Sequence, residues 1–208
     1  NDLDYKIAKE LKTEPMSKGD AQTFTINGSY PMIRGVKRSL IISQDFSKKY
    51  FYNETTGAVS SDKEIEDSKT SLTIQHIDNF FNEGYSQLTI DQSFGVLDLS
   101  GLASDLSSDQ ASTGAKTDGN FSKTYVQIYR LQRIVDKLDL QIFGALQLSN
   151  KNLDSSEKFT LGGISGIRSY PSGEASGDEG KKISYDLKFD ATEYSFIPKT
   201  DMFFSVFY

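Results

Sequence analysis

Residues 138–149 read "LDLQIFGALQLS", and their alternation indicates a long β-strand. The apolar side chains at every second position fall on one face: Leu138, Leu140, Ile142, Leu146 and Leu148. Asp139, Gln141 and Gln147 fall on the opposite face. A strand of this length is long for a soluble β-sandwich, where about 5 to 6 residues are usual. It is long enough to cross a lipid bilayer at a tilt.

The same period of two recurs along the chain, and helical periodicity is almost absent. In "SQLTIDQSFGVLDL", Leu88, Ile90, Phe94 and Val96 share one face. In "ISYDLKFD", apolar and aromatic positions again alternate with charged ones. We expect nine strands, at residues 3–13, 20–33, 37–52, 68–80, 85–98, 121–134, 137–149, 182–196 and 201–208.

The expected connections alternate in length after an intermediate first one. Short connections read "RGVK", "FNEG", "VD" and "IPKT", and the long ones are 53–67, 99–120 and 150–181. Short turns at one rim and long loops at the other are typical of an outer-membrane barrel. The sequence therefore predicts an all-β fold, an antiparallel up-and-down transmembrane β-barrel. Because only a closed sheet satisfies its backbone in lipid, about nine strands are expected to be part of a larger barrel.

Composition excludes several classes of function. The chain has no cysteine and one histidine, His76, so thiolate sites and multi-histidine metal sites are absent. The formal net charge of −6 argues against a nucleic-acid surface. No apolar stretch approaches 18 residues, so no transmembrane helix is expected. We expect no catalytic residue, no cofactor and no metal ion.

The segment "FTLGGISGIRSYPSGEASGDEGKK" stands out for its glycines and for the single Arg168. A loop arginine is solvated by default, but this one lies between Ile167 and Tyr170, which suggests a buried tip. A buried guanidinium needs a charge partner. The acidic residues that follow have neither the EF-hand spacing nor the phosphate-loop pattern. Paired carboxylates on 182–196, such as Asp186 and Asp190, alternate with Lys188 and fit a polar barrel wall better than glycosidase chemistry.

The run from Tyr129 to Gly180 resembles the two-partner secretion transporters, the TpsB or haemolysin-activator family. The resemblance is carried by "RLQR", by "LDSSEKFTLGG" and by "IRSYPSGEASGDEG", with "SYPMIR" upstream. The matching positions of the last two motifs include Leu153, Ser156, Glu157, Phe159 and Leu161, followed by Gly162, Gly163, Gly166, Ile167, Arg168, Tyr170, Gly173, Glu174, Gly177, Asp178 and Gly180. Ser169 stands where the family has glycine or alanine.

The resemblance implies a larger protein, with periplasmic POTRA domains before a 16-stranded barrel. Residues 1–208 would be part of that barrel, and 150–181 would be an extracellular loop folded into its lumen. Arg168 would pair with an acidic residue expected just beyond Tyr208. Asp186 and Lys188 are candidates for the lumen wall.

The function implied is an outer-membrane translocator that secretes a TpsA-type exoprotein from the periplasm to the bacterial cell surface. Its partners would be that polypeptide and outer-membrane lipid, without nucleic acid or a small-molecule substrate. Two alternatives remain open at this point. One is an assembly factor of the same superfamily that inserts other outer-membrane proteins, and the other is a β-rich surface binding domain.

Overall fold

The computed structural model describes residues 2–6, 17–162, 175–194 and 203–207. Nine strands form one sheet: β1 (Asp2–Lys6), β2 (Ser17–Arg34), β3 (Arg38–Thr55), β4 (Ala58–Asp78), β5 (Gly84–Asp98), β6 (Gly119–Val135), β7 (Leu138–Ser149), β10 (Gly180–Asp190) and β11 (Phe203–Phe207). The remaining elements are α1 (Ala103–Gln110), η1 (Thr192–Tyr194) and the pair β8 (Phe159–Thr160) and β9 (Ser176–Gly177). No helix of the described ranges is long and apolar enough to cross a membrane.

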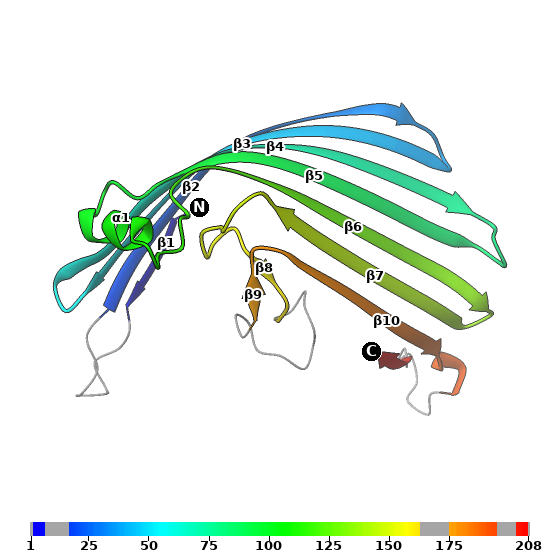
Figure 1. Cartoon of the computed structure of the whole chain (residues 1–208). Helices are drawn as coiled ribbons and strands as arrows, with labels where there is room; N and C mark the ends of the chain where they lie inside the picture. Colours follow the sequence, from blue (N-terminus) through cyan, green and yellow to red (C-terminus); the bar gives the residue numbers. More distant parts are fainter. Residues whose placement is uncertain (1, 7–16, 163–174, 195–202, 208) are drawn as a thin grey trace.

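The nine-stranded sheet is antiparallel and follows chain order, β1-β2-β3-β4-β5-β6-β7-β10-β11. This confirms the predicted up-and-down connectivity. Figure 1 shows the sheet curving into an open wall, with α1 and the β8–β9 pair at the end where β5 and β7 finish. The predicted strand 137–149 is reproduced almost residue for residue by β7.

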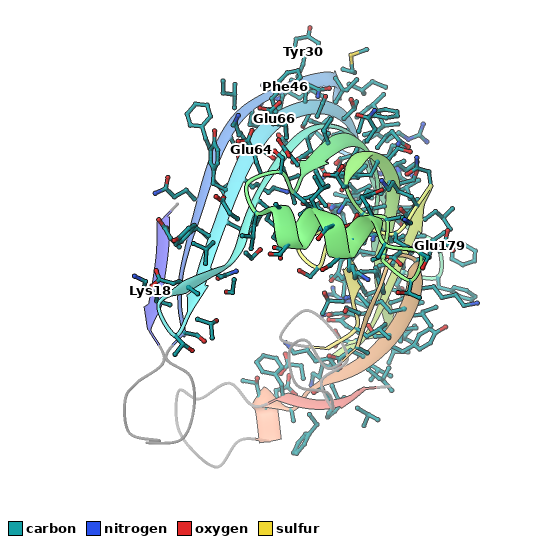
Figure 2. All side chains as sticks on the ribbon, turned by 60° about the vertical axis from the view of Figure 1, so that its left-hand side comes forward. Lys18, Tyr30, Phe46, Glu64, Glu66 and Glu179 are labelled. Carbon is teal, nitrogen blue, oxygen red and sulfur yellow. The ribbon has the colours of Figure 1, made fainter. Side chains whose placement is uncertain are left out.

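Register gives the wall two chemically different faces. One cross-strand row contains Ile26, Phe46, Ser68 and Phe94, from four successive strands. Three of them are large apolar side chains that are more than half exposed. Figure 2 shows Tyr30 and Phe46 pointing away from the space that the sheet encloses, so this is the convex face. The opposite, concave face carries mostly polar side chains. The predicted alternation is therefore confirmed on the central strands.

The predicted long connection 53–67 is wrong. β3 continues to Thr55 and β4 starts at Ala58, so the turn contains only Thr56 and Gly57. The period of two persists here, with Glu64 and Glu66 on one face, while the other face carries a single apolar residue, Ile65, between the charged Lys63 and Asp67. Because the two faces differ little in hydrophobicity, the sequence predicts a loop for residues 53–67. The alternation of long and short connections therefore fails at this hairpin.

Two other boundaries also differ from the prediction. β10 ends at Asp190 instead of extending to residue 196, and residues 191–202 connect it to β11, so this connection is longer than "IPKT". The expected loop 99–120 contains the helix α1. Its sequence, "ASDLSSDQ", has one large apolar residue and shows no amphipathic signal. Tertiary contacts of Leu106 and Asp109, described below, hold it in place.

Replacing Thr56 by asparagine should stabilise the protein. Thr56 and Gly57 have φ angles of 55° and 81°, the left-handed pair of a two-residue hairpin turn. A β-branched residue is strained there, whereas Asn-Gly is the preferred pair. We expect a gain of about 1 kcal/mol in unfolding free energy, measured by denaturant unfolding of the detergent-solubilised protein. Gly57→Ala should change stability in the opposite direction, and equal effects of the two substitutions would contradict this account of the turn.

Candidate functional site: a loop base docked on the concave wall

The carboxylate of Glu157 lies between two lysines of the concave face. Glu157 follows β7 in the chain and is only 5% exposed. Its Oε1 is 2.6 Å from Nζ of Lys49 on β3, and its Oε2 is 2.8 Å from Nζ of Lys123 on β6. A buried carboxylate requires such compensation because removing it from water is costly. One loop residue thus ties together two strands that are not neighbours in the sheet.

The backbone of the loop is held at the same place. Lys123 Nζ donates to the carbonyl oxygen of Glu157 at 3.0 Å. Gln147 Nε2 on β7 donates both to that carbonyl, at 3.2 Å, and to the carbonyl of Asp178, at 2.9 Å. The buried amide of Gln147 thus holds both the outgoing and the returning segment of the loop against the wall.

A small hydrophobic core lies beneath the loop. Leu153, 2% exposed, packs in a cluster with Ile65, Leu97, Leu99 and Phe121 from the concave face. Leu106 of α1 packs against the same cluster. Burying a leucine side chain in this way stabilises docking by about 1.5 to 3 kcal/mol. The loop is therefore anchored by apolar burial as well as by charge.

The ring of Phe159 lies directly over Gly180, the first residue of β10. A Cβ added at Gly180 would overlap the ring, with 2.9 Å to Cγ and 3.0 Å to Cε1. Phe159 is 5% exposed, and its centroid lies 6.3 Å from that of Tyr125. Glycine is required at this position because the ring occupies the place of a side chain.

Asp178 connects the two legs of the loop. Its Oδ1 accepts from the backbone N–H of Leu153 at 2.8 Å and lies 3.2 Å from Nζ of Lys158. Burial alone would raise the pKa of the Asp178 carboxyl, but the Leu153 N–H and the Lys158 ammonium outweigh it and lower that pKa. The strands β8 and β9 continue the pairing, with Phe159 opposite Gly177.

A further ion pair joins the loop to the long β3–β4 hairpin. Lys63 Nζ on β4 lies 2.7 Å from Oδ2 of Asp154. Burial would raise the pKa of the Asp154 carboxyl, yet the hydrogen bond from Lys63 and those from Ser156 lower it. The upper part of this hairpin, which the sequence predicted as a loop, therefore supplies an anchor for the loop 150–181.

The helix α1 lies across the opening that the curved sheet encloses (Figure 2). Asp109 holds the chain that returns to β6: it accepts from the N–H and hydroxyl of Thr117 at 2.8 and 2.7 Å and from the N–H of Asp118 at 3.1 Å. Burial acts to raise the pKa of the Asp109 carboxyl, but these hydrogen bonds lower it to about 2. The side chain is therefore an anion at neutral pH and keeps the loop folded.

The predicted loop motif is only partly within the described residues. Gly162, Gly177, Asp178 and Gly180 lie in the docked base. The rest of the motif lies outside the described residues: Gly163, Gly166, Ile167, Arg168, Tyr170, Gly173 and Glu174. The role given to Arg168 thus stays a prediction.

The two candidates for the lumen wall lie on β10. Register places Asp186 opposite Gln141 and Lys188 opposite Asp139, on the same face as Gly180 and hence on the concave side. Lys188 Nζ lies 3.9 Å from the ring centroid of Phe203 on β11. That this face lines a passage stays a prediction.

Sequence reasoning assigned no role to Glu157, Lys49 or Lys123. Glu157 and Phe159 matched the motif "LDSSEKFTLGG", which was the available signal for the loop side of the contact. Nothing local marks Lys49 or Lys123, since lysines recur on many strands. Their partnership with Glu157 depends on the register of the whole sheet.

Comparison with known proteins gives a consistent result. The sequence model of a family described as haemolysin secretion/activation protein ShlB/FhaC/HecB matches residues 1–205. The chain is 28% identical over 193 residues to the heme/hemopexin transporter protein HuxB of Haemophilus influenzae, covering 90% of this chain and 32% of HuxB. The chain thus spans about a third of the length of the curated relatives it matches.

Two solved structures share the fold. CdiB from Escherichia coli superposes with a TM-score of 0.73 at 19% identity, covering 91% of this chain and 34% of CdiB. CdiB from Acinetobacter baumannii gives a TM-score of 0.69 at 14% identity, covering 99% and 35%. This likeness confirms the predicted fold class, an antiparallel up-and-down β-barrel, of which the sheet described here is an open part.

Proposed function

Because the chain belongs to the ShlB/FhaC/HecB family of haemolysin secretion/activation proteins, we propose that the whole protein is a translocator of the bacterial outer membrane. It moves a large partner exoprotein from the periplasm to the cell surface through the barrel lumen. Residues 1–208 supply part of the barrel, and 150–181 form an extracellular loop that folds into the lumen. This transport requires no covalent bond to be formed or broken.

One observation carries this proposal: the wall is apolar on its convex face and polar on its concave face, where the loop base is docked. Large exposed side chains such as Phe46 and Phe94 suit contact with lipid tails. A polar interior suits an aqueous passage, and a closed sheet leaves no unpaired backbone in the hydrocarbon. The similarity to HuxB, which is described as a heme/hemopexin transporter protein, also supports a role in transport.

The loop 150–181 has two parts with different tasks. Its base is held by Glu157, Leu153 and Phe159 and remains fixed to the wall. Its tip carries Arg168, which latches the resting lumen by pairing with an acidic residue just beyond Tyr208. Passage of the exoprotein then requires the tip to shift while the base keeps the loop attached.

Replacing Arg168 by alanine in the full-length protein should leave the barrel inserted but greatly reduce exoprotein release. The acidic partner loses the guanidinium that compensates its charge, so the resting lumen loses its defined shape. Release into the medium is measured in cells that express both partners, with barrel insertion checked by surface labelling. Arg38→Ala, at the exposed start of β3, is the matched control and should secrete normally.

Normal secretion by the Arg168→Ala variant would contradict the proposed role of Arg168 as a latch. Loss of other outer-membrane proteins on depletion of the wild-type protein, with exoprotein release unchanged, would favour the assembly-factor alternative. Recovery of the complete gene product as a detergent-free soluble monomer would favour a surface binding domain.

A further inference from the structure

The convex face of the sheet contains a groove that follows strand β4. Its volume is about 600 Å³, within the range of small-molecule binding sites. Its two sides are apolar side chains from β2, β3 and β5, namely Phe24, Ile26, Phe46, Phe94 and Val96. Register explains the groove, because Ser68 on β4 lies between Phe46 and Phe94 in one cross-strand row. A short side chain thus stands between two large ones.

The polar side chains beneath the groove bind to one another. Ser68 Oγ accepts a hydrogen bond from Gln44 Nε2 at 2.9 Å, and Gln44 Oε1 accepts one from Thr70 at 2.7 Å. Phe46 and Phe94 on either side are 55% and 61% exposed. The groove therefore offers apolar packing surface rather than polar recognition, and an acyl chain fits this chemistry.

Charged side chains lie at the end of the groove nearest the long loops. Lys48 follows Phe46 on the same face of β3 and stands opposite Glu66 in register. Its ammonium pairs with the carboxylate of Glu66 at 2.7 Å and with that of Glu64. None of these three side chains is buried. Since Mg²⁺ binds carboxylates and phosphate oxygens together, this level suits a phosphorylated headgroup with its bound cations.

Two tyrosines continue the same face beyond the charged level. Tyr50 and Tyr52 are 44% and 38% exposed, and they lie opposite Glu64 and Asp62 in register. A tyrosine ring next to a carboxylate offers an apolar surface and hydrogen-bond acceptors, which suit the apolar face and the hydroxyls of a sugar. At about 3.4 Å per residue, Tyr52 lies about 20 Å along the strand from Phe46.

The order of these three levels corresponds to one kind of lipid. In the proposed function the long-loop rim faces the outside of the cell, so the groove lies in the outer half of the membrane. A lipopolysaccharide of the outer leaflet has acyl chains, then phosphates, then sugars. The hairpin presents an apolar groove, then charged side chains, then tyrosines. A phospholipid would leave the tyrosines without a contact.

We propose that the convex face of β3 and β4 binds one lipopolysaccharide molecule. An acyl chain lies in the groove, the phosphates lie near Lys48, and the inner sugars contact Tyr50 and Tyr52. This inference rests on the proposed function for the orientation of the wall. Bulk lipid is as apolar as the groove, so the packing of the chain and the contacts of the headgroup, rather than the hydrophobic effect, retain the molecule.

Native mass spectrometry of the full-length protein tests the inference by counting bound lipid. The protein is purified in detergent and incubated with lipopolysaccharide that lacks O-antigen, or with phosphatidylglycerol. The wild-type protein should retain one lipopolysaccharide. Ser68→Phe should lose it, because the new ring fills the space between Phe46 and Phe94. Leu72→Phe is the matched control and should retain it, since Leu72 is on the same face of β4 but outside the groove.

A second pair of variants tests the sugar level and does not depend on filling the groove. Tyr50→Ala combined with Tyr52→Ala should weaken binding of this lipopolysaccharide about tenfold, through loss of two exposed aromatic contacts. Binding of lipid A, which has no core sugars, should stay unchanged. Tyr30→Ala is the control, because Tyr30 is also exposed on the convex face but lies nearer the short turns.

Three results would each overturn the inference: equal retention by the wild-type protein and Ser68→Phe, retention of phosphatidylglycerol in place of lipopolysaccharide, or an adventitious additive only, with detergent as the sole bound molecule. Equal loss of lipid A and lipopolysaccharide by the tyrosine variant would overturn the assignment of the sugar level. All of these counts use purified protein. Absence of exoprotein release by the unmodified protein in cells would instead contradict the proposed function.

Discussion

Replacing Glu157 by leucine should detach the base of the loop from the concave wall. The substitution leaves Lys49 and Lys123 without the carboxylate that lies 2.6 and 2.8 Å from them. Breaking a buried ion pair by removing one partner costs about 3 to 5 kcal/mol. Both lysines keep some solvent contact, with 23% and 18% of their side chains exposed. We therefore expect a loss of about 3 kcal/mol in docking free energy.

A single-cysteine reporter measures this loss. The chain has no cysteine, so Ser155→Cys gives one labelling site, at an exposed position of the loop base. A spin label there should gain mobility when Glu157 becomes leucine. Glu66→Leu is the matched control, since Glu66 also pairs with a lysine, Lys48 at 2.7 Å, but is 59% exposed. That pair should contribute at most about 1 kcal/mol and leave the label unchanged.

A double-mutant cycle then assigns the effect to the ion pair. Lys123→Met alone should also mobilise the label, and adding it to Glu157→Leu should cost much less than the sum of the two changes. Additive losses would mean that Glu157 acts through packing and not through Lys123. An immobile label in the Glu157 variant would contradict the electrostatic anchor.

The strands that were predicted well are those with strong contrast between their faces. In β7, five leucine or isoleucine positions alternate with polar ones, so the period alone located the strand almost to the residue. The upper half of the β3–β4 hairpin carries Glu64 and Glu66 on one face and Lys63 and Asp67 on the other. Ile65 is the one apolar residue between Lys63 and Asp67, so the contrast in hydrophobicity is too weak to mark this part as strand.

Of the contact between the loop and the wall, only the residues of the loop could be predicted from the sequence. The motif around Glu157 and Phe159 indicated that the segment 150–181 is special, and Gly180 followed from the same motif. The lysines that receive Glu157 are 108 and 34 residues away in the chain. Choosing them among the other lysines requires the register of every strand from β3 to β7. This register depends on how all of these strands pair with one another, and no local sequence pattern specifies it.

Replacing Gly180 by valine should displace Phe159 from the wall and detach the loop at a second point. The new side chain would occupy the space of the aromatic ring, whose Cγ lies 2.9 Å from an ideal Cβ. Either the ring leaves its buried site or β10 shifts, and both are costly because packed interiors yield little. We expect a loss of about 2 to 3 kcal/mol, measured with the same Ser155 label and by exoprotein release. Gly28→Val is the control, since nothing lies within 4 Å of a Cβ there.

Removal of the ring distinguishes a steric clash from a direct effect on the sheet. In the Gly180→Val background, Phe159→Ala frees the space that valine needs, so β10 should regain its pairing with β7. The loop itself should stay mobile, because Phe159 no longer packs against Tyr125. A folded wall with a mobile loop and poor release would show that docking of the loop base, and not only an intact barrel, is required for secretion. Unimpaired release by this double variant would show that the base can leave the wall without consequence, and would confine the function of the loop to its tip.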